Sequence, residues 1–177
     1  MFKEFFRKKP EKVLHEHAAK EINDLKKTLG TELKASLYLY KEEKFIICSI
    51  AGFAEYGEPT VLDVNAADAA IGLAVYDKLL KFKAKSIELR PSGKLEDWPA
   101  YKASGAKTGN FFESNSIFVY FRTFNTVINM DAAPRISLEK SLKAHCSIPN
   151  GISHLEIGRE IRKVIKAANV LRQAKMM

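Results

Sequence analysis

The feature that most constrains the fold of this chain is a strand–turn–helix pattern that occurs twice. The first copy opens with the short apolar run 61–64, and apolar residues then recur at helical spacing over 67–82. The second copy opens with the run 146–149, and residues 157–171 again form one apolar helical face. We predict that both runs are strands of one sheet, and that each leads into a helix packed on that sheet.

The first turns of the two expected helices are similar. Asn65 and Asp68 stand three residues apart, and we expect them to cap the first helix. Ser153 and Glu156 form the S-x-x-E capping box of the second helix. An isoleucine–glycine pair then follows in each helix, Ile71 with Gly72 and Ile157 with Gly158. We interpret the two units as a pseudo-repeat within one domain.

The remaining pattern predicts a single mixed α+β domain that covers residues 1–177. A helix between Pro10 and Gly30 precedes a strand over 33–39 whose alternation indicates one solvent-exposed face. A buried strand over 45–50 and a glycine-containing loop over 51–59 come next. The predicted architecture is a mixed, mostly antiparallel sheet with helices packed on it.

Four further segments complete the expected order of elements. Strands over 117–121 and 126–130 form a hairpin, and a helical turn is expected at 138–142. The periodicity fades over 83–107, where a short helix is expected near Trp98. Residues 1–9 are expected to form a loosely ordered, flexible terminus.

Charge and cysteine content limit the class of protein. The formal charge of +8 favours an anionic partner. Cys48 and Cys146 both lie in apolar runs, which indicates buried free thiols in a reducing compartment. The sequence has no signal peptide and no apolar run of about 20 residues, so we expect a soluble, cytoplasmic protein without a membrane partner.

The motifs of common enzymes are absent from the sequence. The run 104–109 lacks the glycine that precedes the lysine of a phosphate-binding loop, and no G-x-S-x-G elbow occurs. His145 and Cys146 are adjacent in an expected strand, so their side chains point to opposite faces and cannot form a dyad. The histidines and cysteines have no metal-site spacing. We therefore predict no catalytic residue, no metal and no cofactor.

A nucleic-acid-binding module is the alternative function. Residues 118–121 match the end of an RNA-binding strand signature, whose aromatic residues stack on bases, but the glycine-containing head of that signature is missing. Basic residues gather over 78–85 and 159–166. These residues are equally typical of the solvated face of an amphipathic helix.

Three segments carry a resemblance to a known family. They are GAKTGNFFESNSIFVYF (105–121), VINMDAAP (127–134) and CSIPNGISHLEIGREIRKVI (146–165). Together with AADAAIGLAVYDKLLKF (66–82), they resemble the immunity proteins of bacterial contact-dependent growth inhibition systems, and the likeness spans residues 33–171. The resemblance implies a non-enzymatic protein that binds the C-terminal toxin domain, often a nuclease, and blocks it inside the producing cell.

The inhibitor of a basic nuclease surface is usually acidic, whereas this chain is basic overall, so it either presents a local acidic patch or binds an acidic toxin. A local acidic patch could come from two segments: Glu96, Asp97, Trp98 and Tyr101 in one, and Glu55, Tyr56 and Glu58 in the other. Trp98 is the only tryptophan and is a candidate anchor of the interface. A role in the core is the competing interpretation of Trp98.

Overall fold

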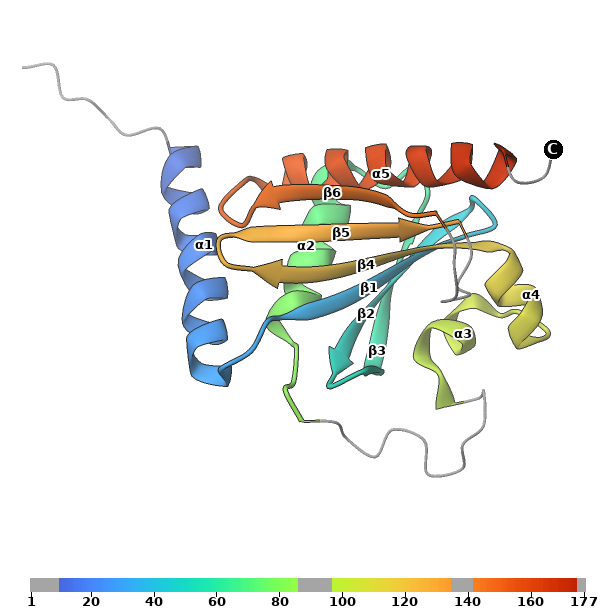
Figure 1. The fold of residues 1–177 in the computed structure, drawn as a ribbon, viewed down its shortest axis with the longest axis horizontal. Helices are drawn as coiled ribbons and strands as arrows, with labels where there is room; N and C mark the ends of the chain where they lie inside the picture. The colour runs from blue at the N-terminus through green and yellow to red at the C-terminus, as the bar shows by residue number, and fades with distance from the viewer. Residues whose placement is uncertain (1–9, 86–96, 135–141, 175–177) are drawn as a thin grey trace, which may run out of the picture.

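A six-stranded antiparallel sheet with helices on both faces forms the centre of the molecule (Figure 1). The computed structural model describes residues 10–85, 97–134 and 142–174. The strands are β1 (Lys34–Tyr40), β2 (Lys44–Ala51), β3 (Ala54–Asp63), β4 (Ser116–Phe124), β5 (Val127–Ala133) and β6 (Ala144–Pro149). The helices are α1 (Pro10–Leu29), α2 (Asp68–Leu80), α3 (Pro99–Ser104), α4 (Gly109–Ser114) and α5 (His154–Ala174). The predicted fold class is confirmed.

The two strand–turn–helix units lie at opposite edges of this sheet. The strand order is β3-β2-β1-β4-β5-β6, so β3 and β6 are the edge strands. β3 leads into α2 and β6 leads into α5, as the repeat predicts. Both helices pack on one face of the sheet, where Leu37, Ile47 and Val119 are fully buried against them.

Glycine at one position in each unit sets the distance between α2 and α5. A Cβ atom added to Gly72 would lie 1.8 Å from the backbone oxygen of His154. One added to Gly158 would lie 1.9 Å from the backbone oxygen of Asp68. The helices therefore cross in direct backbone contact, which explains why glycine follows isoleucine in both units.

The two helix starts differ in their capping. Ser153 Oγ accepts a hydrogen bond from the Glu156 amide at 3.1 Å, and the Ser153 amide donates to Glu156 Oε2 at 3.0 Å, so the predicted capping box is confirmed. The capping role predicted for Asn65 and Asp68 is wrong. The Asn65 amide donates to Asp63 Oδ1, α2 begins after Ala67, and Asp68 pairs instead with Arg162.

The loop predicted over 51–59 is mostly strand. A tight turn at Gly52, where φ is +61°, leads directly into β3. Gly57 has a φ of +70° and lies where the pairing of β3 with β2 shifts register, so this glycine marks a β-bulge. Pro59 is tolerated because β3 is an edge strand.

The predicted exposed face of β1 is also wrong. Ser36, Tyr38 and Tyr40 alternate with the apolar residues of β1 as expected, yet all three are buried. The reason is tertiary: α3 and α4 cover Tyr38 and Tyr40, and the Ser36 hydroxyl donates a hydrogen bond to Glu55 of β3. Polar alternation in the sequence could not reveal that a second layer lies above it.

The hairpin and the short helix near Trp98 are confirmed as β4–β5 and α3. The sequence did not predict α4, whose first turn is capped by Thr108 Oγ1, which accepts from the Phe111 amide at 3.2 Å. The flexible terminus (1–9) lies outside the described residues, as does nearly all of the helical turn (138–142). Within the described residues, no helix combines the length and the apolar character that a membrane span requires.

Candidate partner-binding site

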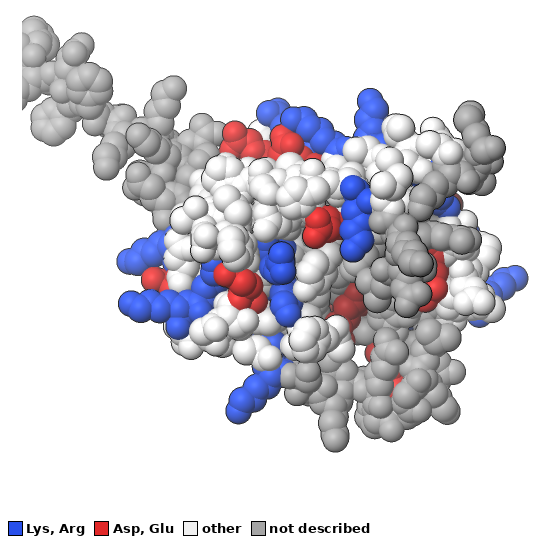
Figure 2. All heavy atoms as spheres, in the orientation of Figure 1, with Lys and Arg blue, Asp and Glu red and all other residues white. Residues whose placement is uncertain are grey.

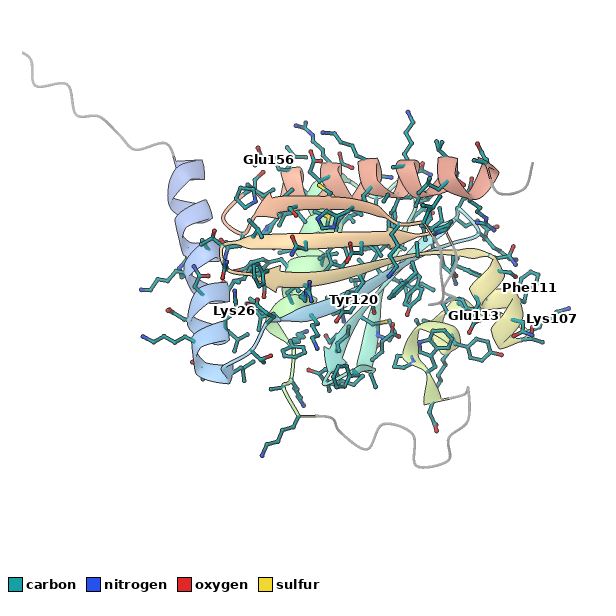
Figure 3. All side chains as sticks on the ribbon, in the orientation of Figure 1. Lys26, Lys107, Phe111, Glu113, Tyr120 and Glu156 are labelled. Carbon is teal, nitrogen blue, oxygen red and sulfur yellow. The ribbon has the colours of Figure 1, made fainter. Side chains whose placement is uncertain are left out.

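Among the described residues, helices cover only part of the second face of the sheet. α3 and α4 pack on it over β1 and β2 and form a small second core: Tyr38, Tyr40, Ile46, Cys48, Ala100 and Phe112. Over β4, β5 and β6 no helix of the described part of the chain lies on this face, and Figure 1 is viewed from that open side. Tyr120 lies on the open side of the sheet, whereas Phe111 projects from α4 and Lys107 from the segment just before it (Figure 3).

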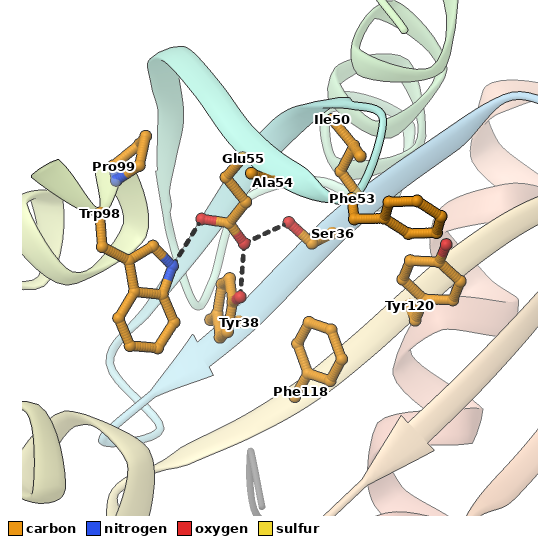
Figure 4. Close-up of a pocket in the computed structure, with 10 residues that line it drawn as sticks. All are labelled: Ser36, Tyr38, Ile50, Phe53, Ala54, Glu55, Trp98, Pro99, Phe118 and Tyr120. Carbon is orange, nitrogen blue, oxygen red and sulfur yellow. Dashed lines mark hydrogen bonds between the residues drawn. The ribbon is translucent and has the colours of Figure 1, made fainter. Parts of the chain in front are cut away.

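A hollow of about 300 Å³ lies where α3 meets the open face (Figure 4). Its lining comes from β1, the end of β2, the turn after it, the start of β3, the start of α3, and β4: Ser36, Tyr38, Ile50, Phe53, Ala54, Glu55, Trp98, Pro99, Phe118 and Tyr120. Half of these ten residues are aromatic, and Glu55 is the one charged residue among them.

Glu55 links its own strand, β3, to β1 and to the start of α3 at the wall of this hollow. Its Oε1 accepts hydrogen bonds from the Ser36 and Tyr38 hydroxyls of β1, the former at 2.6 Å. Its Oε2 accepts from the indole Nε1 of Trp98 at 2.9 Å, which fixes the start of α3 (Figure 4). The carboxylate is therefore both a structural link and a negative charge at the wall of a hollow.

Burial and the charge of Glu55 also affect the pKa of two neighbouring groups, Tyr38 and Cys48. Burial, and secondly the Glu55 charge, raise the pKa of the Tyr38 hydroxyl well above its usual value. The same two causes raise the pKa of the Cys48 thiol. Both groups stay protonated at neutral pH, and Cys48 is an inert buried thiol.

The structure brings Glu55, Trp98 and Tyr101 together. Tyr101 is roughly parallel to Trp98, with ring centroids 6.4 Å apart. Trp98 is half-buried and meets Phe112 edge-on at 5.0 Å. Trp98 thus packs on the small core with one side and lines the hollow with another. Part of its surface is buried in a core, and another part is available to a partner.

The other expected site residues lie around this group. The Tyr56 hydroxyl donates to the carbonyl of Lys81, and Lys83 Nζ lies 4.8 Å from the Tyr56 ring centre. Burial raises the pKa of Tyr56. Glu58 and Asp97 line a second hollow between β3 and α3. Glu96 lies outside the described residues.

Sequence reasoning missed the residues that β1 and β4 contribute to the hollow. Tyr38, Phe118 and Tyr120 form a row of rings, with Tyr38 and Phe118 centroids 5.1 Å apart. The period-two alternation of both strands placed these aromatic residues on one face. What it could not show is that β1 and β4 are neighbours although about 80 residues separate them.

A polar network occupies the open face of β5 and β6. His145 Nδ1 lies 2.8 Å from Asp131 Oδ1, and its Nε2 lies 3.0 Å from Ser147 Oγ. These residue types also form hydrolase triads, but here the Ser147 hydroxyl donates to Asn129 Oδ1 at 2.6 Å. The His145 side chain is 56% exposed on a strand face, where water weakens electrostatic stabilisation. We interpret the network as surface pairing.

Cys146 points to the other face, as predicted, and lies 3.9 Å from Glu160. Across the described ranges, no three His, Cys, Asp or Glu side chains are grouped so that they could hold a metal ion. Figure 2 shows basic and acidic side chains interspersed over the open side of the molecule.

Comparisons with known proteins concern the fold. The sequence matches no protein-family model, and no curated protein matches it. The fold is similar to that of NMB0488, a protein of unknown function from Neisseria meningitidis, with a TM-score of 0.57 and 20% identity over 77% of this chain and 93% of that one. It is also similar to a chain of the CdiA-CT/CdiI toxin and immunity complex from Yersinia pseudotuberculosis. That match has a TM-score of 0.56 and 13% identity, and it covers 76% of this chain and 96% of the other.

Proposed function

We propose that this protein binds the toxin domain of a contact-dependent growth inhibition system and blocks its activity. The observation that carries the proposal is the similarity of its fold to a chain of a toxin and immunity complex, over 96% of that chain. The segments that resemble immunity proteins in sequence support it, because they form α4, three neighbouring strands and α5.

The toxin is, by the same resemblance, a nuclease, and the protein acts on it in the cytoplasm of the producing cell. Inhibition takes place by binding rather than by catalysis. In support, Glu55 and its three donors tie secondary structure together, and the hydroxyl of Ser147 is directed at Asn129 and not at His145.

The surface proposed for the toxin consists of β3 and α3, with Glu55, Tyr56, Glu58, Glu96, Asp97, Trp98 and Tyr101. Its described acids lie on β3 and just before α3, although the chain as a whole is basic. Trp98 offers a half-buried aromatic surface next to them. Acid beside an aromatic anchor suits a basic nuclease surface.

The proposal is tested with the product of the gene that neighbours the gene for this protein, which we expect to be the toxin. Co-expression should rescue growth of cells that make the toxin, and a tagged toxin domain should co-purify with this protein in a stable complex. An unrelated immunity protein serves as the control. Growth arrest in the presence of this protein, with no complex recovered, would contradict the proposal.

A further inference from the structure

The hollow beside Glu55 combines a carboxylate with aromatic walls, and we propose that it binds a basic side chain, lysine or arginine, of the protein partner. The inference rests on the toxin-binding function proposed above. It adds the chemistry that one pocket of the surface recognises.

The first argument is charge. The side chains that donate hydrogen bonds to the Glu55 carboxylate belong to Ser36, Tyr38 and Trp98, and all three groups are neutral. Among residues 10–85, 97–134 and 142–174, Glu55 takes part in no ion pair. The hollow therefore contains a negative charge that its hydrogen-bond donors do not neutralise.

The second argument is the aromatic lining. Trp98, Tyr38, Phe118 and Tyr120 follow one another along the hollow, with neighbouring ring centroids 5.1 to 6.4 Å apart. The faces of such rings attract cations. The rim already shows this attraction, because Lys34 Nζ of this chain lies 4.6 Å from the ring centre of Phe53.

The third argument is selectivity by size and polarity. A hollow of about 300 Å³ is at the small end of ligand sites and suits one side chain rather than a larger molecule. An apolar side chain would cover the Glu55 carboxylate without pairing it, which is unfavourable. An acidic side chain would be repelled. A basic side chain satisfies both the carboxylate and the rings.

Trp98 makes the inference measurable. It is the only tryptophan in the chain, so its indole N–H gives a single signal in a two-dimensional NMR spectrum. This N–H donates to Glu55 and reports directly on the hollow. The full-length protein is titrated with n-butylammonium and n-butylguanidinium, which mimic the two side chains, and with 1-butanol as the neutral control.

We expect the indole signal to move and reach saturation with both cations and not with 1-butanol. Glu55→Gln should weaken binding of the cations at least about tenfold, because it removes the charge from a partly desolvated site. Asp63→Asn is the matched control: Asp63 is an exposed acid on the same strand, outside the hollow, and this variant should bind the cations like the wild type. An equal response to 1-butanol, or unchanged binding by Glu55→Gln, overturns the inference.

A second variant tests the hollow without changing Glu55, because Glu55→Gln could rearrange the hydrogen bonds around it. Phe53 is 92% exposed, so Phe53→Ser should keep the wild-type melting curve while weakening cation binding roughly twofold to fivefold. With the toxin domain, Glu55→Gln should also lower the affinity of the complex. If the small cations bind and the toxin affinity stays unchanged, the pocket serves a free cation and the inference is wrong. Failure of the wild type to bind toxin would instead refute the proposed function.

Discussion

At the scale of single residues, Gly72 and Gly158 determine how closely two helices approach. Each lies against backbone atoms of the other helix or of its first turn, and backbone atoms cannot move aside as a flexible side chain can. Alanine is the better helix former by about 1 kcal/mol, so propensity alone would predict that alanine stabilises these positions. The contact distances instead predict that alanine destabilises the protein at both positions.

Gly72→Ala should therefore destabilise the protein. Its Cβ would lie 1.8 Å from the His154 oxygen, and separating α2 from α5 costs about 1–3 kcal/mol in the free energy of unfolding, as overpacking does elsewhere. Urea unfolding measures the change. Ala69→Ser, which adds one atom on the exposed side of α2, should have almost no effect. A stability equal to or above that of the wild type would show that the helices are not in contact.

The buried thiol of Cys48 predicts a loss of stability in alkali. In the unfolded chain this thiol titrates near the ordinary cysteine value of 9.0, whereas burial and then Glu55 raise its pKa in the folded protein. Above pH 9.0 the unfolded state loses a proton that the folded state keeps, so the free energy of unfolding falls by up to about 1.4 kcal/mol per pH unit.

Cys48→Ala should lower this pH dependence between about pH 8 and pH 10. Urea unfolding of both proteins across this range measures the two slopes. Lys78, whose pKa burial lowers, acts in the opposite direction and is present in both proteins. Identical slopes would mean that the thiol is accessible to solvent.

At the scale of elements, an edge strand and a short helix form the proposed toxin surface. The bulge at Gly57 interrupts regular pairing of β3 with β2, and Glu58 follows it on the exposed side. α3 lies against this strand, with Asp97 two residues before its first turn begins at Pro99. Neither element is central to the sheet, so both can be changed with little effect on the main core.

Reversing the charge of both acids should slow toxin binding without unfolding the protein. Glu58→Lys combined with Asp97→Lys should lower the association rate with a basic toxin domain at least about tenfold at low salt. Surface plasmon resonance measures the rate. Asp24→Lys on α1, an exposed acid at the far side of the sheet, should leave the rate nearly unchanged. An unchanged rate in the double variant would place the toxin on another surface.

At the scale of the whole molecule, the charge of +8 has to be reconciled with the proposed function. Some of the basic residues bind other groups within the protein. Lys78 is buried and donates to the Glu58 carbonyl at 2.7 Å, and Arg162 donates to Asp68 Oδ1 at 2.6 Å. These two residues belong to the runs that favoured nucleic-acid binding, and their pairing weakens that alternative.

Binding to unrelated RNA should accordingly be weak and sensitive to salt. We expect a dissociation constant no tighter than about micromolar at physiological salt, with affinity that falls steeply as salt rises. A fluorescence titration with labelled single-stranded RNA at several salt concentrations measures this. Submicromolar binding that persists at physiological salt would favour the nucleic-acid-binding module over the immunity protein.

The sequence by itself determined what depends on neighbours along the chain. Period-two spacing located β1, helical spacing located α1, α2 and α5, and apolar runs located β2 and β6; the Ser153–Glu156 box located the start of α5. The sequence repeat also indicated that Ile71 and Ile157 are equivalent core positions, and both residues are buried. Such signals are local, because a backbone conformation and its capping group lie within a few residues of each other.

Only the tertiary structure decided where distant segments meet. The glycines and the proline over 51–59 are compatible with a loop and also with a bulged edge strand. Hydrogen-bonded pairing with β2 makes most of this segment a strand. Tyr38 alternates like a solvent-exposed residue, yet α3 and α4 bury it. The hollow joins Glu55, Trp98 and Tyr120 from three elements, so no spacing in the sequence predicts it. Burial and site geometry depend on contacts between residues far apart in the chain, and the local pattern carries no record of those contacts.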